Sequence, residues 1–404
     1  MRANTPGFIG ERLTQVRKSL GLSGIGLAGL LGVSATTVSQ YEKNKQSPRP
    51  EIMDRICEKL NSPRAFFLRP ISDRGERAIL YRSLAAATKS ARERAEVRFE
   101  WLREITEYLH GHFEFPKLNL PSMDLPVDFR TLTHDAIERA AMQCRQLWGF
   151  GEGPIGDVVL ALESNGIIVA RGELGSEALD AFSEYLPNDF PYIFLGTDKH
   201  VAARSRFDAA HELGHLILHR HLRQRDFGHP KDFKTLESQA HRFAAAFLLP
   251  GNAFLKSIWA PTLDAFRGQK ETWKVSIKGM IVRTHQLGVI DENKYARLMI
   301  NYGRRYREGE PGDDVLKMEQ PRFLARCFEM LLAERICTKE QLLINLPLQP
   351  HDIEELASLP RGFFSGFKGE VIELPVLRKV PRESASEDGQ TAEIISLPPF
   401  KVAS

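Results

Sequence analysis

Residues 206–219 read Arg-Phe-Asp-Ala-Ala-His-Glu-Leu-Gly-His-Leu-Ile-Leu-His. Within this stretch His211, Glu212 and His215 follow the pattern His-Glu-x-x-His. Residues four apart in a helix lie one turn apart on the same face, so both imidazoles can reach one zinc ion. Glu212, beside the first ligand, can then touch a metal-bound water and take its proton. The flanking residues are apolar, which predicts a helix inside a domain rather than on its surface.

Gly214 is unusual inside such a helix, because glycine there costs about 1 kcal/mol relative to alanine. Its expected use is to let another backbone come close. The competing interpretation of the whole stretch is a chance His-x-x-x-His pair on an ordinary helix. Five letters alone do not decide between the two.

A catalytic zinc takes three protein ligands and keeps one position open, so a third ligand is needed. Residues 237–250, Glu-Ser-Gln-Ala-His-Arg-Phe-Ala-Ala-Ala-Phe-Leu-Leu-Pro, predict a second helix that ends at Pro250 and Gly251. Glu237 and His241 are four apart and share one face of that helix. Either of them could be the third ligand.

These two blocks, in this order and spacing, resemble the ImmA/IrrE family of bacterial metallopeptidases, and the resemblance extends over about residues 133–305. It implies a zincin-like domain that binds Zn²⁺ through His211, His215 and Glu237, with Glu212 as the catalytic residue. Where the family usually has Asn, this chain has His241. Three roles stay open for His241: it binds the metal, steadies the transition state, or packs.

The composition is that of a globular protein of two to four domains. The chain has 404 residues, of which 42% are hydrophobic and 26% charged. It shows no apolar run long enough for a membrane span and no signal peptide, and we expect no membrane partner. Its four cysteines show no paired spacing, which predicts reduced thiols and a cytoplasmic location. They are Cys57, Cys144, Cys327 and Cys337.

Positive charge is concentrated at the N-terminus. Residues 1–70 contain eleven Lys or Arg against five Asp or Glu, about +6, whereas the whole chain carries +3. The remainder is therefore slightly acidic. A basic end on such a chain indicates a module that faces phosphates.

Residues 8–70 predict a bundle of short helices, with Gly21 ending the first, Ser23 capping the second and Ser34 capping the third. The helix–turn–helix spacing and the turn at residues 32–34 resemble the XRE-type helix-turn-helix domain. In that motif the second helix of the pair enters the major groove, which implies operator DNA as a partner. The expected base contacts are Ser34, Ala35, Thr36, Thr37, Ser39 and Gln40, and the expected phosphate contacts are Lys43, Lys45 and Arg49.

One departure leaves DNA binding open. The family usually begins the first helix of the pair with Gln, whereas this chain has Gly24, and Gly26 and Gly29 weaken that helix further. The alternative is a helical domain that has kept its fold but binds a protein. XRE-type domains often pair on two half-sites, so a homodimer is also an expectation.

The other segments complete an α+β, mainly helical chain. Residues 71–130 predict a charged helical connector followed by a proline-containing linker. Residues 131–308 predict the metallopeptidase domain, with helices opening at Thr133 and Pro154, strands at 167–170 and 192–195, the site helix beginning near Val201, and two helices after Ser276. A polar loop between the ligand helices is expected to support the ligands or face solvent. It contains His219, His221, Asp226, His229 and Asp232.

Residues 309–404 predict a helical C-terminal region with a flexible tail. Helices are expected at 315–332 and 338–359, and disorder is expected from about Arg382 to Ile394. No role beyond sensing or substrate docking follows from this segment.

Two functions remain in competition. The first is a zinc endopeptidase that regulates transcription by cleaving a helix-turn-helix repressor, as similar proteins do, and so derepresses stress, mobile-element or defence genes. Hydrolysis would proceed by a zinc-bound water with Glu212 as general base. The second is a DNA-binding repressor or antitoxin whose peptidase-like domain senses a ligand or metal without turnover. Glu212 argues for the first, because a sensing zinc does not need that carboxylate.

Overall fold

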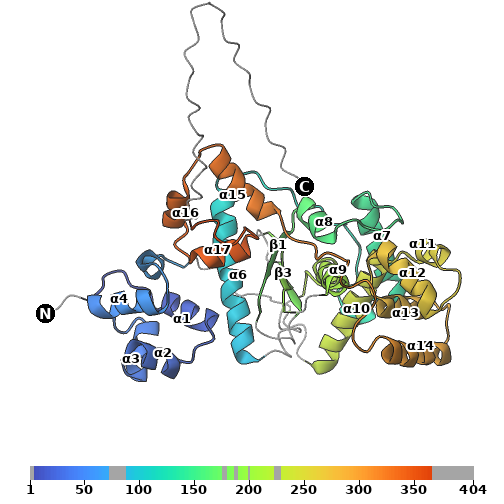
Figure 1. Cartoon of the computed structure of the whole chain (residues 1–404), viewed down its shortest axis with the longest axis horizontal. Helices are drawn as coiled ribbons and strands as arrows, with labels where there is room; N and C mark the ends of the chain where they lie inside the picture. Colours follow the sequence, from blue (N-terminus) through green and yellow to red (C-terminus); the bar gives the residue numbers. More distant parts are fainter. Residues whose placement is uncertain are drawn as a thin grey trace, which may run out of the picture. The chain divides into compact units, whose positions relative to one another are not determined.

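The computed structural model describes residues 4–71, 88–174, 180–185, 190–198, 201–222 and 229–365 (Figure 1). Over these residues the chain is mainly helical with one small sheet, so the predicted α+β class is confirmed. None of the described helices combines the length and the hydrophobicity that a membrane span needs. The expected disorder after Arg382, part of the predicted connector, and Asp226 lie outside the described residues.

The N-terminal bundle forms from local signals, as predicted. Its elements are α1 (Gly10–Ser19), α2 (Gly24–Leu31), α3 (Ala35–Glu42), α4 (Pro50–Lys59) and the 3₁₀ helix η1 (Arg64–Leu68). Ser23 accepts the Gly26 N–H at 3.0 Å, and Ser34 accepts the Thr37 N–H at 3.0 Å. Gly32 ends α2 with φ of +64°, a conformation that glycine adopts without strain.

The charged segment predicted as a connector contains α6 (Lys89–His110), which is buried on more than one side. Trp101 of α6 meets Phe66 of the bundle edge to face, with ring centroids 5.9 Å apart. Phe99, also on α6, packs on Phe182 and Tyr192 of the sheet, with ring centroids 5.6 and 5.2 Å apart. Since each large side chain buried in this way contributes about 1.5–3 kcal/mol, α6 is a core element that joins the bundle to the sheet.

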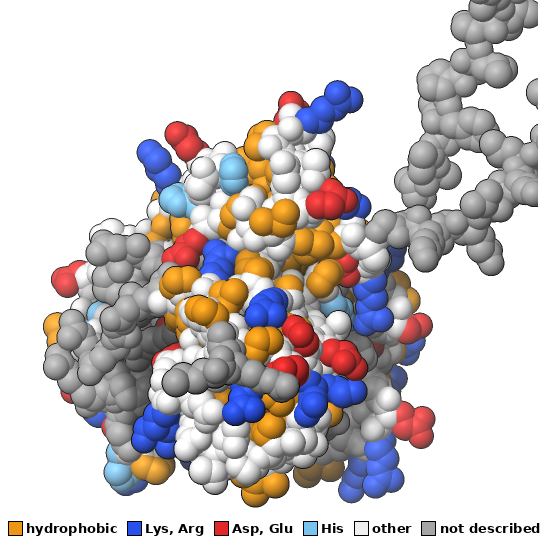
Figure 2. Space-filling view, turned by 90° about the vertical axis from the view of Figure 1, so that its left-hand side faces the viewer, with side chains coloured by type: hydrophobic (Ala, Val, Ile, Leu, Met, Phe, Trp, Pro, Cys, Tyr) orange, Lys and Arg blue, Asp and Glu red, His pale blue; other side chains and the backbone are white. Residues whose placement is uncertain are grey.

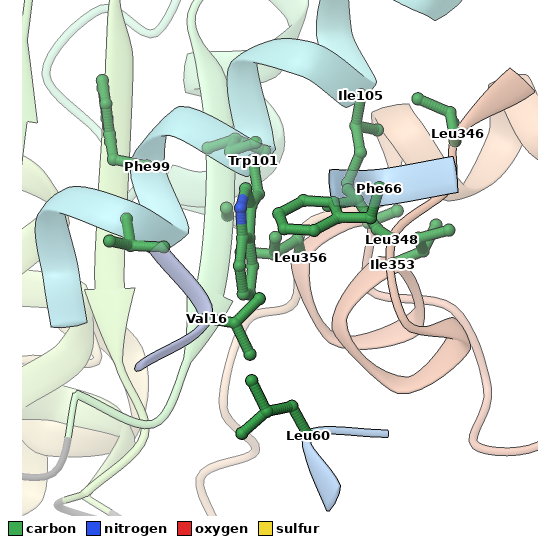
Figure 3. Close-up of a cluster of buried hydrophobic side chains, with 14 of the residues drawn as sticks. Val16, Leu60, Phe66, Phe99, Trp101, Ile105, Leu346, Leu348, Ile353 and Leu356 are labelled. Carbon is green, nitrogen blue, oxygen red and sulfur yellow. The ribbon is translucent and has the colours of Figure 1, made fainter. Parts of the chain in front are cut away.

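Figure 3 shows the centre of this core, where Trp101 lies among side chains from the N-terminal bundle, from α6 itself and from the C-terminal region. Val16 and Phe66 come from the bundle, and Ile353 and Leu356 come from the C-terminal region. The bundle, the sheet and the helices up to Ser365 belong to one compact unit.

The sheet is covered by helices on both faces. Its strands are β1 (Ile168–Gly172), β2 (Ala181–Glu184) and β3 (Tyr192–Gly196), in the order β1-β3-β2, with β1 parallel and β2 antiparallel to β3. Alternate residues point to opposite faces, so Phe182 and Phe194 pack towards α6 whereas Ala181 and Ile193 pack on the other side. β1 and β3 were predicted and β2 was not.

The opposite face of the sheet is covered by α8 (Val158–Ser164) and α9 (Ala202–Leu218), and the other helices of the motif region pack around these two. They are α7 (His134–Leu147), α10 (Pro230–Leu248), α11 (Gly251–Ser257), α12 (Leu263–Trp273), α13 (Ile277–Gln286) and α14 (Glu292–Arg305). Thr133 and Ser276 cap α7 and α13, as predicted. The helix expected to open at Pro154 instead begins at Val158 behind the cap Asp157. The preceding residues are not helical, and the carbonyls of Ile155 and Gly156 accept hydrogen bonds from Arg206.

The C-terminal helices are shorter than predicted. They are α15 (Phe323–Ala333), α16 (Lys339–Asn345) and α17 (Pro350–Leu356). The helix expected from Val315 begins eight residues later, at Phe323. Glu319, which lies in between, accepts the Val158 N–H at the start of α8 instead. The helix expected over 338–359 is interrupted before Pro350, a residue that disfavours helix in the position preceding it.

Carboxylates from distant parts of the chain cap three of these helices. Glu319 accepts the Val158 N–H at the start of α8 at 2.8 Å, and Glu310 accepts the Ile277 N–H at the start of α13 at 2.8 Å. Glu163, at the end of α8, accepts the Phe323 N–H at the start of α15 at 3.0 Å. Helix N-termini favour negative charge. Burial nevertheless raises the pKa of Glu163 to about 7.

Candidate metal centre

The two helices that carry the motif blocks approach closely at Gly214. A Cβ at this position would lie 3.1 Å from Cδ1 of Phe243 and 3.2 Å from the carbonyl oxygen of Ala240, both on α10. A Cβ here would require Phe243 or the Ala240 carbonyl to shift by a few tenths of an ångström, which agrees with the expected use of Gly214. The close approach brings the motif face of α9 against the middle of α10.

Three of the predicted ligands converge at this contact. His211 Nε2 and His215 Nε2 lie 3.1 Å apart, and the two oxygens of the Glu237 carboxylate lie 3.4 Å from them. The ligand atoms of the three residues all lie within 4.8 Å of one another.

This arrangement fits a zinc ion. Two imidazole lone pairs and a carboxylate that face one another repel unless a cation or a proton lies between them. Two nitrogens and one carboxylate form the ligand set of many catalytic zinc sites, with a fourth position left open. Their role as ligands stays a prediction.

Glu212 lies beside these residues, and its side chain is buried. Ser183 of β2 donates a hydrogen bond to Oε2 of Glu212 at 2.6 Å. Burial raises the pKa of Glu212 to about 7. Sequence reasoning missed Ser183, because β2 is only four residues long and shows no alternation that would mark it as a strand.

His241 lies next to the three converging residues rather than among them. Its ring meets that of His211 edge to face, with centroids 4.4 Å apart, and its Nδ1 donates to the carbonyl oxygen of Glu237 at 2.7 Å. Since Nδ1 is used in this way, Nε2 is the ring atom available for a ligand or a substrate. The choice among the three roles proposed for His241 stays open.

His219 contacts the ring nitrogen of His215 that does not face Glu237. His219 is fully buried, and its Nδ1 lies 2.9 Å from Nδ1 of His215. Its Nε2 lies 2.9 Å from Oε1 of Gln239, whose Nε2 donates to the carbonyl oxygen of Phe129 at 2.7 Å. Burial, followed by the neighbouring His215, lowers the pKa of His219 well below its ordinary value.

The other described residues of the polar segment, His221, His229 and Asp232, are not among the three residues whose ligand atoms converge. His221 is exposed. His229 caps α10 by accepting the Lys231 N–H at 3.2 Å, and Asp232 pairs with Arg130 at 2.9 Å. The sequence identified this segment as supporting or solvent-facing but did not single out His219, nor did it single out Gln239.

The second candidate site is the surface of α3. Ser34 is exposed and caps the helix, Ala35, Thr36 and Gln40 are exposed, and Thr37 and Ser39 are partly exposed. The cations expected at phosphates, Lys43, Lys45 and Arg49, are exposed as well. Figure 2 shows the side of the molecule where the N-terminal helices lie, with basic, acidic and hydrophobic side chains interspersed. Ile25 and Leu30 of α2 are exposed apolar residues, which keeps the protein-binding alternative open.

Comparisons with known proteins agree with both sites. Residues 162–283 match the family model described as IrrE N-terminal-like domain, and residues 13–67 match a helix-turn-helix family model. A search among curated proteins found no match to the chain. The helix-turn-helix domain implies DNA binding, and the second match indicates a metallopeptidase-like domain. The chain thus carries matches to a helix-turn-helix model of the XRE type and to the IrrE N-terminal-like model of the ImmA/IrrE family, in the order that the sequence predicted.

Proposed function

We propose that the chain is a cytoplasmic zinc-dependent endopeptidase that regulates transcription by cleaving a helix-turn-helix repressor. Cleavage would derepress stress, mobile-element or defence genes. The proposed domains are residues 8–70 for DNA binding, 71–130 as the connecting segment, 131–308 for peptidase chemistry and 309–404 as a C-terminal region without an assigned role.

One observation carries the enzymatic part of the proposal. His211, His215 and Glu237 converge within 4.8 Å, and a buried carboxylate, Glu212, lies on the same helix beside the first ligand. A metal held for structure or sensing needs the three ligands but not Glu212. The combination therefore favours catalysis.

The residues divide the chemistry among themselves. A zinc ion bound by His211, His215 and Glu237 would supply a Lewis acid and lower the pKa of a water. Glu212 would accept the proton of the attacking water and return it to the leaving amine. The hydrogen bond from Ser183 holds one carboxylate oxygen of Glu212 and thereby orients the other.

The fused helix-turn-helix domain argues against broad proteolysis, because regulation requires one target. It could hold the peptidase at an operator, repress the operon directly, or itself be the substrate. A homodimer on two half-sites belongs to the same proposal.

A metal-dependent cleavage assay tests the proposal. The purified full chain, with zinc or with a chelator, is mixed with the helix-turn-helix protein encoded beside its gene and analysed on a gel. We expect a chelator-sensitive cut that is absent in Glu212→Gln. No cut with zinc, manganese or iron, together with tight operator binding, would instead support the second candidate, a DNA-binding repressor whose peptidase-like domain senses a ligand or metal.

A further inference from the structure

We propose that His219 and Gln239, anchored on the carbonyl of Phe129, form a hydrogen-bond relay that holds His215 in the tautomer whose Nε2 lone pair faces the metal position. His219 and Gln239 are thus positioning residues, which act on the metal only through His215. This inference deepens the proposed metal site and rests on it, but its central claim concerns the metal-free protein.

The direction of the relay is set at its far end. A backbone carbonyl can only accept, so the Gln239 atom 2.7 Å from the Phe129 oxygen must be the amide nitrogen. The Gln239 oxygen therefore faces His219, and His219 Nε2, at 2.9 Å, must carry the hydrogen. This assignment follows from donor and acceptor chemistry and not from the choice of amide orientation.

The same logic passes through His219 to the metal ligand. A neutral imidazole that carries its hydrogen on Nε2 has an acceptor at Nδ1. His215 Nδ1, at 2.9 Å, must then be the donor. With its hydrogen on Nδ1, the His215 ring presents an unprotonated Nε2 to the position between His211 and Glu237.

The anchor itself is held by packing. Phe129 lies in the 3₁₀ helix η2 (Phe129–Thr131), and its buried side chain forms a small cluster with Leu222 and Leu236. Leu222 follows α9 and Leu236 lies on α10, and these are the two helices that carry the predicted ligands. The carbonyl is therefore fixed relative to both helices, which gives the end of the predicted linker a role in the site.

His211 provides an internal contrast. Its Nδ1 is buried and has no hydrogen-bond partner among the described residues, so no comparable chain sets its tautomer. The two histidine ligands thus differ in how far their orientation is fixed before a metal arrives. A metal-ligand histidine whose second nitrogen is held typically binds about 10–100-fold more tightly than one whose partner is removed.

The first test reads the tautomers directly. In the full-length chain, ¹⁵N-labelled at histidine and freed of metal, long-range ¹H–¹⁵N spectra distinguish protonated from unprotonated ring nitrogens. We expect the hydrogen of His215 on Nδ1 and that of His219 on Nε2. A hydrogen on His215 Nε2, or a doubly protonated His219, would overturn the proposal whether or not the chain cleaves any protein.

The second test compares two substitutions of His219. In His219→Gln the amide offers an acceptor to His215 and a donor to Gln239, whereas in His219→Phe only the ring volume is kept. Zinc affinity, measured by competition with a chelator, should fall about 10–100-fold in His219→Phe and much less in His219→Gln. If His219 only filled space, Phe would be the better replacement, so the reverse order would refute the relay.

Two controls keep this comparison interpretable. Thr284→Val removes another fully buried hydrogen bond of the same region, from Thr284 to the Met280 carbonyl, and should leave zinc affinity unchanged. Thermal unfolding of each variant shows whether it folds. If His219→Phe does not fold, Gln239→Leu takes its place, and unchanged zinc affinity in that variant would contradict the proposal.

Discussion

The two helices that carry the candidate sites, α3 and α9, position their candidate residues in opposite ways. In α3 the predicted contacts lie on the surface. The start of this helix is fixed locally, because the Ser34 side chain accepts a hydrogen bond from the Thr37 N–H three residues later. In α9 the motif residues are buried, and their partners come from other elements. Glu212 meets Ser183, 29 residues earlier in the chain, and the partner of His219 in turn meets Phe129, 110 residues away.

The difference shows what each kind of site demands of the fold. A surface that binds a charged polymer needs exposed donors in roughly the right place, and local signals suffice for that. A buried catalytic group must have its remaining hydrogen-bonding atoms satisfied, because unpaired polar atoms are costly away from water. Such a site therefore depends on segments that the motif itself does not contain.

The strongest test of this contrast is Glu212→Gln. We expect cleavage to fall by about 10²–10⁴-fold, because the general base is lost while the metal ligands stay. Zinc affinity and DNA binding should be unchanged, since neither uses the carboxylate. Cleavage is measured on a gel, zinc by chelator competition and DNA by gel shift. Cleavage at the wild-type rate would remove Glu212 from the mechanism.

The packing of α9 on α10 can be tested at Gly214. Gly214→Val should destabilise the protein by about 1–3 kcal/mol, because the added side chain meets Phe243 and the Ala240 carbonyl. Gly268→Val is the matched control, since a Cβ there has nothing within 4 Å. Urea unfolding of both variants measures the difference. Equal stabilities would show that α10 can move aside at no cost.

A third prediction concerns the distant cap Glu163, whose folded pKa of about 7 lies above the ordinary value of 4.5. The stability associated with the protonated group is complete below pH 4.5 and is lost as the pH rises through 7. Glu163→Gln removes this titration, so its stability relative to the wild type should rise on the order of 1–3 kcal/mol between pH 4.5 and 7. Thermal melts of both proteins over this range measure it. A difference that does not change with pH would mean that the carboxyl group titrates normally.

The smallest effect is expected at the surface of α3. Replacing Lys43 and Lys45 together with Ala should weaken binding to mixed-sequence duplex DNA by about tenfold and reduce its salt dependence by about two phosphate contacts. Cleavage of a repressor in the absence of DNA should not change. Titrations at several salt concentrations provide the measurement. An unaltered salt dependence would favour the protein-binding alternative for this domain.

Much of the element pattern could be predicted. The caps Ser34, Thr133 and Ser276 and the turn glycine Gly32 were read correctly because each acts within a few residues of itself. The strand β2 was missed. The segment that contains α6 was predicted to be a helical connector, and its apolar positions did not show that Trp101 and Phe99 pack in the core. Periodicity records which residues share a face but not what that face meets.

The sequence by itself predicted most of the helices, the approach residue Gly214, the shared face of His211 and His215 and the shared face of Glu237 and His241, because spacing within one helix places side chains on one face. The choice of Glu237 over His241 as the third ligand came from the family resemblance. Only the tertiary structure decided that Glu237 faces both histidines, that Ser183 holds Glu212, and that the Phe129 carbonyl sets the direction of the His219–Gln239 relay. Hydrogen bonds and packing across a hundred residues depend on how elements meet in space. That information is absent from the local order of residues.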